Sequence, residues 1–202
     1  MSRLTTLIPD RMTPAQREAY DRIVEARSRV PQDGVHDAVY PPMRPNADGS
    51  LGGPFNAWVR SPAVGPALVA LGGALRFRTA LAPRLVELAI LVVAREWTAQ
   101  YEWYAHARFA EKAGIEPDII EGIRRKERPP LAQPADLAVY AFAVELLRTR
   151  GVSEPAYQAL LAQVGEQGVV ELVGLLGFYT TVSMTLNTFR IQAPGERPPL
   201  DP

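Results

Sequence analysis

The stretch that decides the fold is RLVELAILVVAREWTAQYEWYAH, residues 84–106. Residues 86–94 are apolar except for Glu87, a pattern that indicates a segment buried on all sides. A buried strand over residues 86–93 would show the same pattern, but the length of the run and its alanines favour a helix. We therefore predict a buried helix over residues 83–97 with one carboxylate in its interior.

A second helix is predicted over residues 99–113, and Gly114 is placed to end it because glycine tolerates a left-handed C-cap. Thr13 and Pro14 have the residue types of an N-cap and a first-turn proline, so an amphipathic helix of about four turns is expected from Pro14 through residues 15–30. Further helices are predicted over residues 53–58, 62–75, 117–126, 134–150, 154–163 and 168–189. The predicted fold class is all-α.

The prolines are concentrated near the two ends and suggest three parts. Residues 1–52 are predicted to form a helix and a long loop, because residues 31–53 lack periodicity and contain Gly, Pro, Asn and Asp. Loops of this length usually have a function or wrap a partner. Residues 53–190 are predicted to form one helical domain, and residues 191–202 a proline-rich tail.

Composition excludes several classes of function. The chain has 22 Lys and Arg residues against 22 Asp and Glu residues, so neither nucleic acid nor an anionic membrane is an expected partner. The start of the chain does not resemble a signal peptide and apolar runs such as residues 88–94 are short, so we expect a cytoplasmic protein that does not enter a membrane. The absence of cysteine excludes thiol catalysis and disulfides.

Three side chains are candidates for acid–base chemistry. Glu87 is a carboxylate in an apolar helix, where burial costs free energy unless a partner or a function compensates. Glu102 and His106 are four residues apart and so share one helix face, where the carboxylate would raise the pKa of the imidazole and orient it. The structural alternatives are an interhelical salt bridge for Glu87 and a solvated surface pair for the other two.

Aromatic residues surround this pair more densely than any other part of the chain. They are Trp97, Tyr101, Trp103, Tyr104 and Phe109. Small-molecule sites are often lined by aromatic rings around a few polar groups, which predicts a pocket here. Aromatic residues at helical spacing are, however, more often part of the core or of an interface between subunits.

Residues 84–106 resemble the core of the carboxymuconolactone decarboxylase-like family, which also contains alkyl hydroperoxidase D. In the peroxidase branch, a Glu on one helix precedes a Cys-x-x-Cys-x-x-x-His motif on the next, and Glu87 and His106 match its Glu and His. Its two cysteines correspond to Ala99 and Glu102, so this sequence resembles a cysteine-less branch. The spacing Glu102-x-x-x-His106 is similar to that of the decarboxylase branch.

The resemblance implies an alkyl hydroperoxidase D-like helical bundle and a cofactor-free enzyme of the decarboxylase type. Its substrate would be a small carboxylated lactone or unsaturated acid from aromatic catabolism, which loses CO₂ or shifts a double bond. His106, with Glu102 and Glu87, would move the proton. An arginine would bind the substrate carboxylate, with Arg76 or Arg78 as candidates unless they are solvated helix-end residues. Further candidate pocket residues are Phe55, Trp58, Trp103, Tyr179 and Asn187.

Two other functions stay open on the sequence alone. A non-enzymatic, ligand-binding oligomer of the same fold would have lost its chemistry with its cysteines. A metal site is less compatible with the sequence, because only one histidine lies in the core and the Glu-x-x-His spacing of di-iron bundles is absent. The resemblance also implies a homo-oligomer, a trimer or hexamer, for which residues 168–189 and the two proline-rich arms are candidate interfaces.

Overall fold

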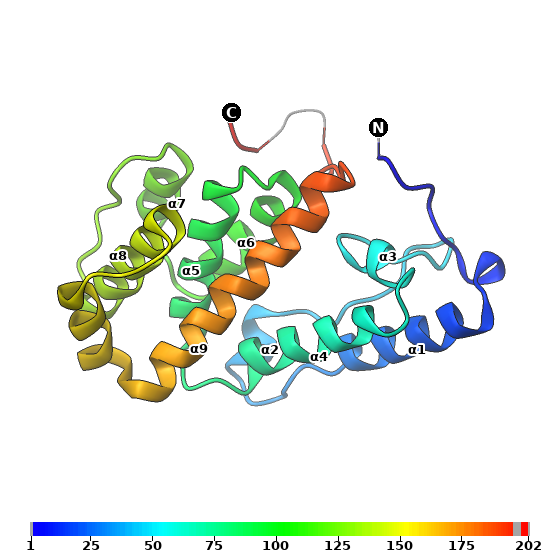
Figure 1. Cartoon of the computed structure of the whole chain (residues 1–202), viewed down its shortest axis with the longest axis horizontal. Coiled ribbons are helices and arrows are strands. Elements are labelled where there is room, and N and C mark those ends of the chain that lie inside the picture. The colour runs from blue at the N-terminus through cyan, green and yellow to red at the C-terminus, as the bar shows by residue number, and fades with distance from the viewer. Residues whose placement is uncertain (1, 196–198, 202) are drawn as a thin grey trace.

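The computed structural model describes residues 2–195 and 199–201. Within those ranges the regular secondary structure is helical, as predicted. The elements are η1 (Pro9–Arg11), α1 (Pro14–Ser28), α2 (His36–Val39), α3 (Phe55–Trp58), α4 (Val64–Phe77), α5 (Pro83–Glu96), α6 (Gln100–Lys112), α7 (Pro117–Arg124), α8 (Pro134–Thr149) and α9 (Glu154–Thr188). Figure 1 shows α9 crossing the molecule between a group formed by α5 to α8 and a second group that contains α1, α3 and α4.

The helix α5 lies at the centre of the fold. Ten consecutive residues, 86–95, are buried, and the helix packs against α6, α8 and α9. An element covered on several sides must be apolar around its whole circumference, which explains why the sequence shows no polar face here. Pro83 begins the helix at a position where its missing N–H is not needed.

An ion-pair cluster fixes the start of α5 against the neighbouring helices. Arg84 donates to the buried carboxylate of Asp136 on α8 through Nε and Nη2, at 3.0 and 2.8 Å. The same guanidinium donates to Glu116, at 2.6 Å, and to the carbonyl of Gly114. One arginine therefore connects α5, α8 and the end of α6.

The long helix α9 contains a kink at Gly165, whose φ of 68° and ψ of 175° are not helical. The kink separates the segments that the sequence predicts as two helices. An 18-residue segment of α9 has a mean hydropathy of 1.6, so the helix is long and apolar enough to cross a membrane. Half of that segment is buried inside the fold. The expectation that every apolar stretch is too short to cross a membrane therefore does not hold for the length of α9. The burial of this segment is typical of a helix in a protein core.

The N-terminal part of the chain packs along α4 and α3. Thr13 and Gln16 form a capping box at the start of α1, and α1 lies beside α4. Asn56 exchanges two hydrogen bonds with the backbone of Leu7, at 3.0 and 2.8 Å. The backbone N–H of Arg3 donates to the carbonyl of Phe189, just after α9, at 2.9 Å.

The described part of the tail returns to α6. Gln100 donates to the carbonyl of Leu200 at 2.9 Å and accepts from its N–H at 2.8 Å, and the Leu200 side chain is buried. Residues 196–198 and 202, which belong to the predicted proline-rich tail, lie outside the described residues. The start of α6, which leads directly to the candidate residues, is thus held by the tail as well as by α5.

Candidate functional site

The imidazole of His106 lies between two carboxylates. Its Nδ1 is 2.7 Å from Oε2 of Glu87 on α5, and its Nε2 is 3.1 Å from Oε1 of Glu102 on α6. The exposed fractions of Glu87, Glu102 and His106 are 0%, 3% and 6%. The solvated-pair alternative for Glu102 and His106 is therefore wrong, and the structure brings all three predicted residues together.

A tight turn between α5 and α6 makes this meeting possible. Thr98 has a φ of 47°, in the left-handed region, and the N–H of Ala99 bonds back to the carbonyl of Ala94 at 2.8 Å. The turn brings α6 back against α5, so that residues 19 positions apart face each other. Within α6, the one-turn spacing of Glu102 and His106 stacks their side chains on one face.

The two carboxylates set the charge of the imidazole. Burial alone would lower the pKa of His106, but the charges of Glu87 and Glu102 outweigh it and raise that pKa to about 9. His106 is therefore protonated at neutral pH, and each ring nitrogen has a hydrogen to donate. The site holds a proton in a dry environment between two possible acceptors.

A cavity of about 240 Å³ opens beside this cluster. His106 and Glu102 line it, whereas Glu87 lies behind the imidazole and does not. The other lining residues are Arg27, Pro41, Pro42, Met43, Pro54, Phe55, Trp58, Val69, Gly72, Arg76, Tyr101, Ala105, Arg108, Phe109, Phe178, Tyr179 and Val182. A volume below the range of about 300–1,000 Å³ for drug-sized ligands points to a small molecule.

Four of the predicted pocket residues line this cavity. Phe55 and Trp58 come from α3, Arg76 from α4, and Tyr179 from α9. The ring of Tyr179 lies edge-on to the imidazole of His106, with centroids 5.1 Å apart. These residues, distant in sequence, line the same space as the acid–base residues of α6.

Three predicted pocket residues lie elsewhere. Arg78 follows α4 and lines a separate surface depression beside Phe77. Trp103 is buried in the hydrophobic core, because it occupies a different face of α6 from its neighbour Glu102. Asn187 donates to the carbonyl of Trp97 at 2.8 Å and so caps the end of α5.

Arg27 and Tyr40 are among the residues of the site that were not predicted from the sequence. Arg27, on α1, lines the cavity, and Tyr40 lies under the guanidinium of Arg76, 4.1 Å from its ring centroid. Burial and the charge of Glu87 raise the pKa of Tyr40, so its phenol stays protonated. The one signal for this region was the length of the loop over residues 31–53, which supplies Tyr40 and three cavity residues, 41–43.

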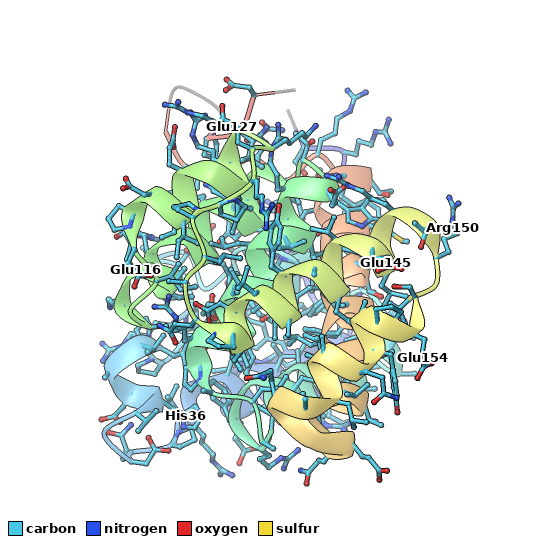
Figure 2. All side chains as sticks on the ribbon, turned by 90° about the vertical axis from the view of Figure 1, so that its left-hand side faces the viewer. His36, Glu116, Glu127, Glu145, Arg150 and Glu154 are labelled. Carbon is cyan, nitrogen blue, oxygen red and sulfur yellow. The ribbon has the colours of Figure 1, made fainter. Side chains whose placement is uncertain are left out.

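The second histidine lies apart from this cluster. Figure 2 shows His36, the first residue of α2, at the edge of the molecule, and its Nδ1 is 2.6 Å from Oδ2 of Asp33, which precedes that helix. Among the residues that the structure describes, no three His, Cys, Asp or Glu side chains are arranged to hold a metal ion. Of the two histidines, His106 lines the cavity and His36 does not.

Comparisons with known proteins agree with this architecture. The family model described as "Carboxymuconolactone decarboxylase family" matches residues 62–145, the segment that contains α4 to α6 and the three clustered side chains. This central segment of the chain is therefore similar to the carboxymuconolactone decarboxylase family. The chain contains no cysteine. No functionally curated protein matches its sequence.

Solved structures share the fold of this chain at low sequence identity. A protein of unknown function from Agrobacterium tumefaciens, described as a candidate antioxidant defence protein AhpD, is 18% identical, with a TM-score of 0.63 over 71% of this chain and 99% of that one. The apo debrominase Bmp8 is 10% identical, with a TM-score of 0.67 over 93% and 91% of the two chains. Its C82A variant in complex with 2,3,4-tribromopyrrole is 12% identical, with a TM-score of 0.67 over 98% and 96%.

Proposed function

We propose that this protein is a cofactor-free acid–base enzyme of the carboxymuconolactone decarboxylase type, which acts on a small carboxylated lactone or unsaturated acid. The observation that carries the proposal is the position of the His106 imidazole between Glu87 and Glu102, at the wall of a small cavity. The similarity of residues 62–145 to the carboxymuconolactone decarboxylase family supports this chemistry. We also propose that the protein is located in the cytoplasm and forms a homo-oligomer.

The roles of the three residues follow from their positions. Glu87 lies behind the imidazole, outside the cavity, and therefore orients His106 and stabilises its positive charge. Glu102 and His106 line the cavity, so a proton is exchanged with the substrate through this pair. A protonated imidazole is ready to act as the acid at the start of the reaction.

Both proposed reactions use this proton. In decarboxylation, the bond between the substrate carbon and its carboxylate breaks, CO₂ leaves, and the electron pair moves into the conjugated carbonyl system. His106 then protonates the carbon skeleton at the far end of that system. In double-bond migration, Glu102 first removes a proton next to the carbonyl, and the same pair returns a proton two carbons further along. Neither reaction involves net oxidation or reduction.

The test is turnover of lactone acids and β,γ-unsaturated acids in deuterated water, with NMR detection of deuterium in the product. His106→Gln keeps a polar side chain but cannot carry the proton, and we expect its rate to fall by about 10²–10⁴-fold. His36→Gln, which changes the histidine outside the cavity, is the matched control and should keep the wild-type rate. A wild-type rate in His106→Gln would refute the proposal. Binding of these acids without turnover by the wild type would instead favour the non-enzymatic alternative.

A further inference from the structure

Two of the three arginines that line the cavity, Arg27 and Arg76, carry buried guanidinium atoms and lack an acidic partner, and the third, Arg108, is exposed. Arg76 is 5% exposed and Arg27 is partly buried, and the Nε of each is buried without a hydrogen-bond acceptor. Both side chains line the cavity beside His106. Within the described ranges, the arginines that form ion pairs with carboxylates are Arg17, Arg29, Arg84, Arg124, Arg125 and Arg148.

Aromatic rings support these two guanidinium groups without neutralising them. Arg76 lies over the ring of Tyr40, at 4.1 Å from the centroid, and Arg27 over the ring of Phe55, at 5.4 Å. Such contacts hold a guanidinium plane in place but leave its N–H groups unpaired. Burial, together with the positive charge of Arg76, lowers the pKa of Arg27 to about 10. Both groups are charged at neutral pH and repel each other.

Burial of two like charges is unfavourable. An anionic ligand bound between Arg27 and Arg76 would compensate for this cost. The buried charges of the site are Arg27, Arg76 and protonated His106 against Glu87 and Glu102, which leaves one positive charge. A single carboxylate would neutralise this excess. The planar fork of arginine also matches a carboxylate through paired N–H···O bonds.

We propose that Arg27 and Arg76 together bind the carboxylate of the substrate, and that Arg27 is a specificity-determining residue supplied by the N-terminal arm. This inference rests on the proposed function for the identity of the ligand as a substrate. Arg76 lies within the family-matched residues 62–145, whereas Arg27, on α1, lies outside them. The arm therefore completes the binding site in addition to packing along α4.

The test uses binding, which does not require turnover. The probes are a saturated γ-lactone carboxylate, its neutral primary amide, and inorganic phosphate. The saturated lactone has no conjugated double bond to accept the electron pair, so it cannot lose CO₂ during the measurement. We expect calorimetry to show that the wild type binds the carboxylate and neither of the other two. Arg27→Met and Arg76→Met should each weaken carboxylate binding by at least about tenfold, the loss typical of a hydrogen bond to a charged group. Arg22→Met, an exposed arginine on the same helix, is the control and should bind normally.

Stability of the unliganded variants separates a binding role from a structural one. If Arg27 is kept for a ligand, Arg27→Met removes a repulsive charge and leaves Tm equal or higher, while ligand-induced stabilisation is lost. A lower Tm with unchanged carboxylate affinity would overturn the inference, as would equal affinity for the amide or for phosphate. We call Arg27 and Arg76 together the arginine clamp. If Arg27→Met loses carboxylate binding and no acid is turned over by the wild type, the inference about the clamp is supported and the proposed function is refuted. If turnover depends on His106 but KM is unchanged in Arg27→Met, the clamp alone fails.

Discussion

The carboxylate of Glu87 and the imidazole of His106 meet at 2.7 Å, although they belong to different helices and are 19 residues apart. The carboxylate is fully buried, and only one of its two oxygens has a hydrogen-bond partner. A buried carboxylate of this kind depends strongly on its single cationic partner. The pair therefore links the stability of the protein to the charge of the residue that we propose as the proton donor.

Replacement of Glu87 by Gln tests this link. The substitution keeps the size of the side chain but removes the charge that raises the pKa of His106, so that pKa should fall. We expect the alkaline limit of the rate profile to move to lower pH, and the free energy of unfolding to fall by about 1–3 kcal/mol. Glu111→Gln, an exposed residue of α6, is the matched control. An unchanged pH profile in Glu87→Gln would show that Glu87 does not tune the imidazole.

Stability should depend on pH through His106. Its pKa is raised from 6.5 to about 9 in the folded protein, so its contribution to stability is complete below pH 6.5 and is lost as the pH rises through about 9. Urea unfolding across this range measures the effect. The same series on His106→Gln measures the contribution of the other titrating groups, which can then be subtracted. The wild type should lose more stability than this variant between pH 6.5 and about 9. Identical losses would mean that His106 is not protonated in the fold.

Much of the fold and the centre of the site could be predicted because their signals are local. A lone charge in an apolar run identifies Glu87, and four-residue spacing pairs Glu102 with His106. The arginine clamp is different, because the sequence around Arg27 is that of an ordinary amphipathic helix. Arg76 and Arg78 are two residues apart and point to different sides of the end of α4, and the choice between them depends on tertiary packing.

Gly72 allows α4 to approach α9 at the cavity. A Cβ at Gly72 would lie 2.6 Å from Cζ of Phe178, and both residues line the cavity. Gly72→Ala should therefore push the Phe178 ring into the space for the ligand and weaken carboxylate binding, measured by calorimetry. Gly73→Ala is the matched control, because a Cβ on Gly73 would have no neighbouring atom within 4 Å. We expect it to bind normally and to gain about 0.5–1 kcal/mol of stability from the better helix former. Equal affinities in both variants would contradict this account of the cavity wall.

The second segment of α9 carries an exposed apolar stripe that we propose as a subunit interface. Val170, Val173 and Met184 are 72%, 46% and 46% exposed, and Gly177 lies between them with open space beside it. Their spacing of three, four and seven residues places them on one face of the helix. We expect light scattering to show an oligomer for the wild type and a smaller species for the double variant Val170→Glu, Val173→Glu. The control is Gln163→Glu, exposed before the kink. A wild-type monomer would rule out this interface.

The walls of the cavity come from segments far apart in the sequence, since Arg27 on α1 and Val182 on α9 line the same space. Contacts between segments so distant in sequence form slowly, because a long loop must close before they are made. During synthesis, α5 and α6 leave the ribosome long before the end of α9 does. A nascent or prematurely terminated chain would thus lack the part of the cavity wall that Phe178, Tyr179 and Val182 form, and the cavity would be closed only with the final helix.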